Sequence, residues 1–262
     1  MDKKTINQHY TDEAKFFKND IKCTMPDVFV KELEVKKLLS NIKHLSNKNK
    51  INSVLEIGCG NGYTISKLSK KFDADFFGID FNKEMIRLSK NRKIKNASFK
   101  HLNLLKNNFK NEQFDLIFSE RCLINFESWK DQKNALNQIH RILKNKGYFV
   151  MIEAFDDGLK NLNQARKALG LDKIPPAWHN IYFSKSKLEQ FIKNKFVNYD
   201  SNKKISYDNF LSSYYYGSRV LYPSLIEGKS PIKYNNKFIE FFTLIPNIGN
   251  YSPIQACILQ KI

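Results

Sequence analysis

The chain has 262 residues, of which 42% are hydrophobic and 27% are charged. This length supports one full hydrophobic core with additions and is short for two domains of ordinary size. The first residues, MDKKTINQHY, are polar, and no apolar run approaches the roughly 18 to 20 residues that span a bilayer. We therefore expect neither secretion nor membrane insertion.

The four cysteines are scattered and form no C-x-x-C pair. Such a distribution predicts neither a disulfide framework nor a cysteine-based zinc site, and we expect no metal. A reducing cytoplasm is the compartment that fits these residues, which are Cys23, Cys59, Cys122 and Cys257.

The formal net charge of +18 at pH 7 raises nucleic acid or an anionic membrane surface as partners. The excess is mostly lysine, which is spread along the chain with abundant asparagine and forms no basic block. We therefore expect no nucleic-acid partner. Because arginine is the better bidentate anion ligand, the few arginines carry more information than the net charge. They are Arg87, Arg92, Arg121, Arg141, Arg166 and Arg219.

The chain divides into four predicted regions. Residues 1–50 predict an N-terminal helical annex, because apolar residues between Val28 and Leu39 recur at helical spacing. Residues 51–155 alternate short apolar strands with amphipathic helices near 63–71, 83–92 and 129–143. The strands are SVLEIG, DFFGID, ASFKHL, FDLIFS and GYFVMIEAF. This alternation predicts a doubly wound α/β fold with a parallel sheet covered on both faces.

Beyond Glu153 the regular alternation ends. Residues 156–250 predict a cap made of insertions around a sixth strand. We expect an irregular or helical insertion over 156–182, a helix near 184–194 and a strand within 196–207. Two apolar, aromatic segments follow, SSYYYGSRVLYP and NKFIEFFTLIP. Residues 251–262, which contain IQACILQKI, predict the final strand of the core sheet.

The strongest motif is the run from Val54 to Gly62, VLEIGCGNG, in which a buried strand enters a glycine loop and then a helix. Glycines let the backbone turn sharply and approach a ligand at the carboxyl edge of a sheet, beside a helix N-terminus. Asp80 ends the next strand, where a carboxylate can accept hydrogen bonds from both ribose hydroxyls. Taken alone, Asp80 fits NAD or another adenosine cofactor.

Four blocks in order, E-x-G-x-G-x-G, GID, FDLIFS and KNKGYFVMIE, resemble the class I S-adenosylmethionine-dependent methyltransferases over about residues 53–153. The resemblance implies a Rossmann-like, doubly wound sheet of seven strands, mostly parallel, whose antiparallel last strand would be IQACILQKI. It also implies S-adenosylmethionine as cofactor and S-adenosylhomocysteine as product. The chain departs from the family at Asn145-Lys146-Gly147, often Pro-Gly-Gly, and at Asn103, commonly Asp.

Matched position by position, the resemblance assigns cofactor-binding roles along the strand ends. Glu56 and the loop of Gly58, Cys59, Gly60 and Gly62 would bind the methionine end, and Asp80 the ribose. Phe81 and Met85 would flank the adenine, and Asn103 and Leu104 would contact its polar edge. Ser119 and Glu120 would lie near the sulfonium. The alternatives are turn chemistry for Glu56, core packing for Phe81 and Met85, and a loop cap for Asn103.

Outside this core, the segments SERCLINFESWKDQ, PPAWHNIYF and SSYYYGSRVLYP resemble methyltransferases of bacterial capsule and surface-polysaccharide biosynthesis. This resemblance implies O-methylation of a small phosphorylated or nucleotide-linked sugar precursor. A hydroxyl acceptor must lose a proton during the transfer. His179 is the predicted catalytic base because histidine titrates near neutrality. Glu120 and Glu153 are reserves. The alternative for His179 is a structural role within the cap, and either glutamate could instead hold the cap or the methionine amine of the cofactor.

Two arginines are predicted to bind a phosphate of the acceptor. Arg121 follows the fourth strand of the core, and Arg219 lies in the aromatic cap segment. Aromatic side chains that could stack on a sugar or base complete the predicted acceptor site; they are Trp178, Tyr182 and Tyr215. The alternative is that each arginine bridges the cap to the core through a carboxylate.

Three other functions compete with this interpretation. A nucleic-acid methyltransferase is disfavoured because Ser119-Glu120-Arg121-Cys122 lacks the Asp/Asn-Pro-Pro-aromatic pattern used on base amines. A nicotinamide-dependent oxidoreductase is disfavoured by the glycine spacing and Glu56. A noncatalytic module that only binds S-adenosylmethionine stays open, as do the acceptor's identity, O- versus N-methylation and the oligomeric state.

Overall fold

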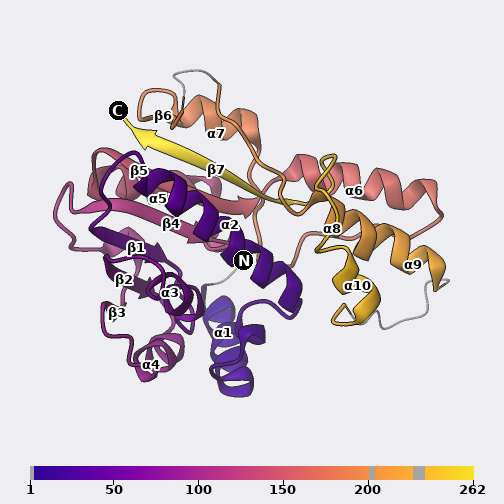
Figure 1. Ribbon diagram of the computed structural model, residues 1–262, viewed down its shortest axis with the longest axis horizontal. Helices are drawn as coiled ribbons and strands as arrows, with labels where there is room; N and C mark the ends of the chain where they lie inside the picture. The colour runs from indigo at the N-terminus through magenta and orange to yellow at the C-terminus, as the bar shows by residue number, and fades with distance from the viewer. Residues whose placement is uncertain (1–2, 201–203, 227–233) are drawn as a thin grey trace.

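The computed structural model describes residues 3–200, 204–226 and 234–262. Its centre is a seven-stranded sheet in the order β3-β2-β1-β4-β5-β7-β6 (Figure 1). β1 to β5 are parallel, and β7 is antiparallel to both β5 and β6, so the predicted Rossmann-like sheet with an antiparallel last strand is confirmed. The strands are β1 (Ser53–Ile57), β2 (Asp75–Asp80), β3 (Ala97–His101), β4 (Phe114–Glu120), β5 (Leu143–Ala154), β6 (Phe196–Asn198) and β7 (Ile254–Lys261).

Helices cover both faces of the sheet. The longer ones are α1 (Lys3–Phe17), α2 (Val28–Ser46), α4 (Lys83–Asn91), α5 (Trp129–Ile142), α6 (Asp156–Ala168) and α7 (Lys185–Ile192). The shorter helical elements are η1 (Ile21–Cys23), α3 (Tyr63–Leu68), η2 (Leu104–Lys106), η3 (Leu123–Asn125), α8 (Ser212–Tyr216), η4 (Gly217–Leu221), α9 (Tyr222–Leu225) and α10 (Lys237–Phe241).

Successive strand residues enter two different hydrophobic clusters, as the period of two in a strand requires. Val54 packs with α2, α3 and α6, whereas Leu55 packs with α5 and α7 on the opposite face. Because both faces are covered, the strands are apolar throughout, which is why they read as continuous apolar runs in the sequence.

The predicted N-terminal annex consists of two helices with different positions. α2 lies directly on the sheet, since Leu38, Ile42 and Leu45 share one cluster with Val54 and Val150. α1 packs instead against α4, with Ala14 beside Met85 and Leu88. The first 50 residues thus contribute a covering layer of the core as well as a separate helix.

The cap contains more helix and less strand than the sequence predicts. Residues 156–182 begin with the regular helix α6, and only 169–182 are irregular. The strand predicted within 196–207 is confined to β6, which pairs with β7 over three residues, and positions 201–203 lie outside the described residues. None of the helices in the described ranges is both long and apolar enough to cross a membrane.

An ion pair joins the cap to the core. Arg219 of η4 donates from Nη2 to Oδ2 of Asp27 at 2.5 Å, and Tyr214 of α8 donates to Oδ1 at 2.7 Å. Asp27 also caps α2 by accepting from the backbone N–H of Val30 at 3.3 Å. One buried carboxylate therefore fixes both the start of α2 and the cap helices.

Gly158 offers a test of how α6 packs. A Cβ at this position would lie 1.9 Å from the carbonyl oxygen of Ser252, in the segment before β7. Alanine in a helix ordinarily stabilises by about 0.5–1 kcal/mol relative to glycine. Here we expect Gly158→Ala to lower the free energy of unfolding by about 1–3 kcal/mol, because overpacking outweighs that gain. Urea denaturation measures the change.

The matched control is Lys160→Ala, which places alanine at an exposed position of the same helix. It should change the free energy of unfolding by no more than about 0.5 kcal/mol. A Gly158→Ala protein more stable than the parent would contradict the packing of α6 against the segment before β7.

Candidate active site

A cavity opens at the carboxyl edge of β1, β2 and β4, where the parallel strands end together. Four groups of residues line it: the first strand and its loop, the second strand with the start of α4, the residues after β3, and the residues after β4. The rest of the lining comes from α1, from Thr24 before α2, from α2, and from the first residues of α3 and α5. The main members are Ile6, Tyr10, Thr24, Lys31, Glu56, Gly58, Cys59, Gly60, Thr64, Asp80, Phe81, Met85, Asn103, Leu104, Glu120, Arg121, Cys122 and Asn125.

The glycine loop after β1 forms one wall. Gly58, Gly60 and Gly62 have φ of 72°, 49° and 74°, in the left-handed region that favours glycine. A Cβ on Gly58 would also lie 2.4 Å from Sγ of Cys122, so this glycine allows the loop after β4 to approach. The backbone N–H groups of Gly58 and Cys59 donate to the carbonyl of Ile79, which ties the loop to β2.

Asp80 lies at the end of β2 beside this loop. Its Oδ2 accepts from the backbone N–H of Gly60 at 2.9 Å, and its Oδ1 accepts from that of Asn82 at 2.8 Å. Burial raises the pKa of Asp80 to about 6, although these two N–H groups oppose the shift. Each carboxylate oxygen has a second lone pair, so Asp80 can still accept two hydroxyl groups of a ligand.

Two more carboxylates, Glu56 and Glu120, line the cavity from β1 and β4. Within the described part of the chain, Oε2 of Glu56 and Oε1 of Glu120 are buried and have no hydrogen-bond partner. Burial raises the pKa of Glu56 well above its ordinary value, and the negative charge of Glu120 raises it further. A ligand that brings hydrogen-bond donors would satisfy both oxygens.

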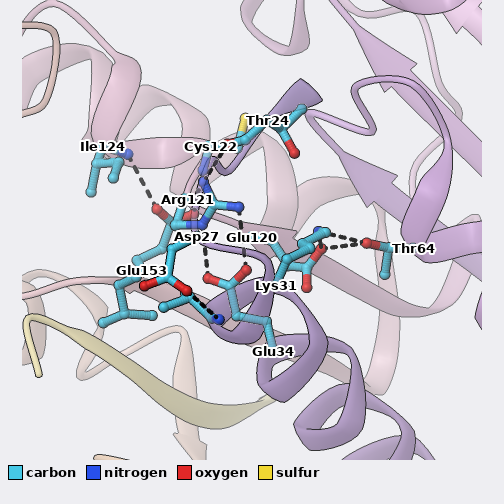
Figure 2. Close-up of polar contacts among 12 residues, drawn as sticks. Thr24, Asp27, Lys31, Glu34, Thr64, Glu120, Arg121, Cys122, Ile124 and Glu153 are labelled. Atoms are coloured by element: carbon cyan, nitrogen blue, oxygen red, sulfur yellow. Dashed lines mark hydrogen bonds and ion pairs between the residues drawn. The ribbon is translucent and has the colours of Figure 1, made fainter. Parts of the chain in front are cut away.

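Figure 2 shows how α2 reaches this edge of the sheet. Lys31 donates to Oε2 of Glu120 at 2.5 Å and to Oγ1 of Thr64 at 2.8 Å, while Thr64 donates to the same Glu120 oxygen at 2.6 Å. One turn further along α2, Glu34 accepts from Arg121 at 2.7 and 3.2 Å in a bidentate pair. Lys31, Glu120 and Glu34 are buried, and Arg121 is partly buried.

Arg121 has its backbone in the left-handed region, with φ of 51°, which costs a non-glycine residue about 1–2 kcal/mol. Its guanidinium also donates to the carbonyl of Thr24 at 2.9 Å, and its backbone N–H donates to that of Ile152 at 2.8 Å. The donors predicted to bind an acceptor phosphate are thus engaged by Glu34 and Thr24. These contacts favour the alternative, in which Arg121 is structural and joins the loop after β4 to α2 and the segment before it.

The contacts of Arg219 favour the same alternative. Its guanidinium is bound to Asp27 and lies 4.5 Å from the ring centre of Tyr215. Neither side chain lines the cavity, and the same holds for Trp178 and Tyr182. Of the five predicted acceptor-binding residues, Arg121 lines this cavity and the other four do not.

His179 also lies outside the cavity lining. Its ring contacts those of His9, Tyr10 and Trp178, at centroid distances of 5.1, 6.0 and 4.9 Å. Burial, reinforced by the nearby His9 and Arg121, lowers the pKa of His179 to about 4. A weakly basic ring that packs behind Tyr10 is poorly suited to accept the acceptor's proton, so the contacts do not support the predicted role as base.

Glu153, a reserve base, is fully buried and holds the loop after β4. Its Oε1 accepts from the backbone N–H groups of Cys122 at 3.1 Å and Leu123 at 2.9 Å, and its Oε2 from that of Ile124 at 3.3 Å (Figure 2). Burial raises the pKa of Glu153 to about 7 against these bonds. Its contacts are those of a structural residue.

The predicted adenine residues Phe81, Met85, Asn103 and Leu104 all line the cavity. Asn103 also caps η2, because its side chain accepts from the backbone N–H of Leu105 at 3.0 Å. Two predicted cofactor residues do not line the cavity: Gly62 turns the chain into α3, and Ser119 is fully buried in β4. The described residues contain no cluster of three His, Cys, Asp or Glu that could hold a metal.

Tyr10 of α1 is a cavity residue that the sequence analysis missed. It accepts from Nδ2 of Asn125 at 2.9 Å and lies edge-on to the ring of Phe81 at 6.4 Å. Burial raises its pKa, so the phenol is neutral. α1 is held over the cavity by the buried amide of Asn82, which donates to Asn7 and Thr11. The spacing of motifs along the sequence does not indicate that α1 lies beside the ends of strands much later in the chain, so Tyr10 could not be predicted as a cavity residue.

Comparisons with known proteins agree with this geometry. The chain is 34% identical over 147 residues to an uncharacterized protein of Methanocaldococcus jannaschii, covering 56% of this chain and 59% of that protein. It is 26% identical over 192 residues to malonyl-[acyl-carrier protein] O-methyltransferase 1 of Ilyobacter polytropus, covering 66% of this chain and 65% of the relative. The chain thus matches less than two thirds of the length of each of these relatives.

Among solved structures, the plantazolicin methyltransferase BpumL, in complex with a pentazolic desmethylPZN analog and SAH, is similar with a TM-score of 0.58. The sequence identity is 18%, and the match covers 98% of this chain and 94% of BpumL. This similarity shows a shared fold. A family model described as a methyltransferase domain matches residues 48–199. Because these residues are more than half of the chain, the protein belongs to the methyltransferase domain family.

Proposed function

We propose that the protein is an S-adenosylmethionine-dependent methyltransferase that acts on a small-molecule acceptor. One observation carries the proposal. A single cavity brings together a glycine loop, a buried acid with an unpartnered oxygen and Asp80, at the carboxyl edge of three adjacent parallel strands. Sites of open α/β sheets lie at this edge.

The donors and acceptors of the cavity fit the parts of S-adenosylmethionine. Asp80 would accept from the ribose hydroxyls, and Glu56 with Gly58 and Gly60 would bind the methionine end. Phe81, Met85 and Leu104 supply apolar surface for the adenine, and Asn103 supplies an amide for its polar edge.

The bound cofactor would supply an electrophilic methyl group and leave as S-adenosylhomocysteine. The protein's part is to align the acceptor behind the methyl and to exclude water. Tyr10 and Asn125 lie where α1 meets the loop after β4 and would shield the transfer. Because His179 is outside the cavity, an acceptor hydroxyl would lose its proton to a carboxylate of the lining or to water.

We propose a broad class of acceptor and, within it, a more specific one. A small molecule fits a cavity covered by α1. The finer proposal, O-methylation of a phosphorylated or nucleotide-linked precursor of surface polysaccharide, has its support in the sequence resemblance of three segments. It gains none from Arg121 or Arg219, which bind Glu34 and Asp27.

S-adenosylhomocysteine should stabilise the folded protein. At about 100 times its dissociation constant, a ligand that binds only the native state adds about 2.7 kcal/mol to the free energy of unfolding. Thermal unfolding with S-adenosylhomocysteine and, as control, with NADH measures the effect. Stabilisation by NADH and none by S-adenosylhomocysteine would contradict the proposal.

Affinity for S-adenosylhomocysteine should fall in acid. If ribose hydroxyls donate to ionised Asp80, whose pKa is about 6, protonation removes the acceptor. Below pH 6 the affinity should drop by up to about tenfold per pH unit and above it should be level. Calorimetric titrations between pH 5 and 8 measure this dependence.

Asp80→Asn is the matched control for that dependence. It should bind more weakly at pH 7, by about 1–3 kcal/mol, and its affinity should change much less between pH 5 and 7. An identical pH profile in the Asp80→Asn protein would show that another group causes the loss.

Isotopically labelled S-adenosylmethionine tests the reaction itself. The protein would be incubated with the labelled cofactor and a small-metabolite extract from a host that lacks this methyltransferase. Mass spectrometry should find label in a small molecule, and only with active protein. Label confined to RNA or DNA, or absent despite cofactor binding, would favour the competing functions.

A further inference from the structure

The proposed cofactor contacts leave one part of the cavity wall unused. They involve Glu56, the glycine loop and the residues that follow β2 and β3. The loop after β4 meets α1 through Asn125 and the segment before α2 through Arg121, and these elements form the other part of the wall. An acceptor would lie against this part, which contains Tyr10, Thr24, Arg121, Cys122 and Asn125.

The positive charges at this part of the wall are already paired. Among the described residues, the basic side chains of the cavity lining are Lys31 and Arg121. Lys31 binds Glu120 at 2.5 Å. Arg121 binds Glu34 at 2.7 and 3.2 Å. Burial raises the pKa of the Cys122 thiol well above its ordinary value, so the thiol is neutral. A phosphate or carboxylate of an acceptor would therefore meet no unpaired cation of the described lining.

Tyr10 and Asn125 supply an unused donor and an unused acceptor. Nδ2 of Asn125 donates to the Tyr10 hydroxyl at 2.9 Å and to the carbonyl of Arg121 at 3.0 Å. Oδ1 of Asn125 is buried and has no hydrogen-bond partner among the described residues. The Tyr10 hydroxyl accepts from Asn125 and donates to none of the described residues, so its O–H can donate to a ligand. Burial raises the pKa of Tyr10, which keeps the phenol protonated.

Contacts on two sides of the ring fix the Tyr10 hydroxyl before any ligand binds. The ring lies edge-on to Phe81 at 6.4 Å and to His179 at 6.0 Å, measured between ring centres. Asn82 holds α1 itself through the hydrogen bonds of its buried amide. A donor and an acceptor that are already held side by side cost little to order when a ligand binds.

A hydroxyl group matches this donor and acceptor. A hydroxyl both donates and accepts at a single oxygen. A carboxylate only accepts, so it would leave Oδ1 of Asn125 without a donor. A protonated amine only donates, so it would leave the O–H of Tyr10 without an acceptor. Either mismatch is costly, because a buried polar atom without a partner loses its hydration and gains nothing in return.

We propose that Tyr10 and Asn125 bind the methyl-accepting group of the substrate, and that this group is the uncharged hydroxyl of an alcohol or a phenol. Tyr10 donates to the hydroxyl oxygen, and Oδ1 of Asn125 accepts from the hydroxyl hydrogen. The inference rests on the proposed function and narrows its acceptor to a hydroxyl compound.

This arrangement leaves the hydroxyl oxygen able to react. One of its two lone pairs accepts from Tyr10, and the other can point at the methyl group. When that pair forms the new C–O bond, the electrons of the S–C bond stay on the sulfur of S-adenosylhomocysteine. The hydroxyl proton passes to water, because the neutral amide oxygen of Asn125 is too weak a base to keep it.

The first test identifies the bond that holds the transferred methyl group. The full chain is incubated with labelled S-adenosylmethionine and the small-metabolite extract of a host that lacks this methyltransferase. The labelled product should be a methyl ether, which keeps its label in mild alkali and does not bind a cation-exchange resin. A methyl ester would release labelled methanol in alkali, and a methylated amine would bind the resin. Either of these products would overturn the inference while the proposed function stands.

The second test compares three variants with the unmodified chain. Tyr10→Phe keeps the ring against Phe81 and removes only the hydroxyl. Asn125→Asp keeps an accepting oxygen but loses the N–H groups, so Tyr10 would donate to the new carboxylate instead of to the acceptor. The control is Tyr63→Phe, which removes the hydroxyl of the other tyrosine in the described lining, at the start of α3.

Initial rates over a dilution series of the extract give the amount of extract at half-maximal rate. Tyr10→Phe should raise this amount by about 5- to 100-fold, and Asn125→Asp should raise it as well. Tyr63→Phe should leave it within about threefold. Calorimetric titration should show that Tyr10→Phe changes the affinity for S-adenosylhomocysteine by less than about threefold, because its hydroxyl contacts the acceptor and not the cofactor.

An unchanged half-saturating amount of extract in the Tyr10→Phe protein would overturn the inference while the proposed function stands. A loss of S-adenosylhomocysteine affinity as large as the change in half-saturation would do the same, because Tyr10 would then bind the cofactor. If the unmodified protein labels no small molecule, or does not bind S-adenosylhomocysteine, the proposed function itself is overturned, and the inference with it.

Discussion

Buried charge must be paired, and this constraint organises the edge of the sheet where the cavity lies. Asp27 caps the start of α2, and Lys31 and Glu34 follow in its first two turns. Each is buried and is bound to an opposite charge on a different segment. The partners are Arg219 of the cap, Glu120 of β4 and Arg121 of the loop after β4. Removal of one member of such a buried pair costs about 3–5 kcal/mol, because the other is left uncompensated.

The same pairs also shape the wall of the cavity. Glu34 and Glu153 hold the loop after β4 from two sides, one through the Arg121 guanidinium and the other through three backbone N–H groups. That anchoring keeps Arg121 in a left-handed conformation and brings Cys122 against Gly58. Lys31 and Thr64 fix the carboxylate of Glu120 at the wall of the cavity. A side chain that is already held in place reduces the ordering cost of binding.

The features that could be predicted from the sequence depend on residues that lie close together along the chain. The apolar runs, the glycine loop and Asp80 lie within single β-α units, so the sheet and most of the cavity wall at the ends of β1 and β2 could be predicted from them. The cap helices, Tyr10 and the role of α2 did not follow, because they depend on contacts between segments far apart in the chain, such as Tyr10 with Asn125. His179 and Arg219 were chosen for their chemistry. Their environments, behind Tyr10 and against Asp27, depend on how the cap packs.

A crystal structure of the full chain with S-adenosylhomocysteine tests the central claim most directly. The account predicts the ribose hydroxyls within hydrogen-bond distance of Asp80 and the methionine end beside Glu56, Gly58 and Gly60. The pairs Lys31–Glu120 and Arg121–Glu34 should be retained. A ligand bound elsewhere, or one whose ribose lies away from Asp80, would contradict it.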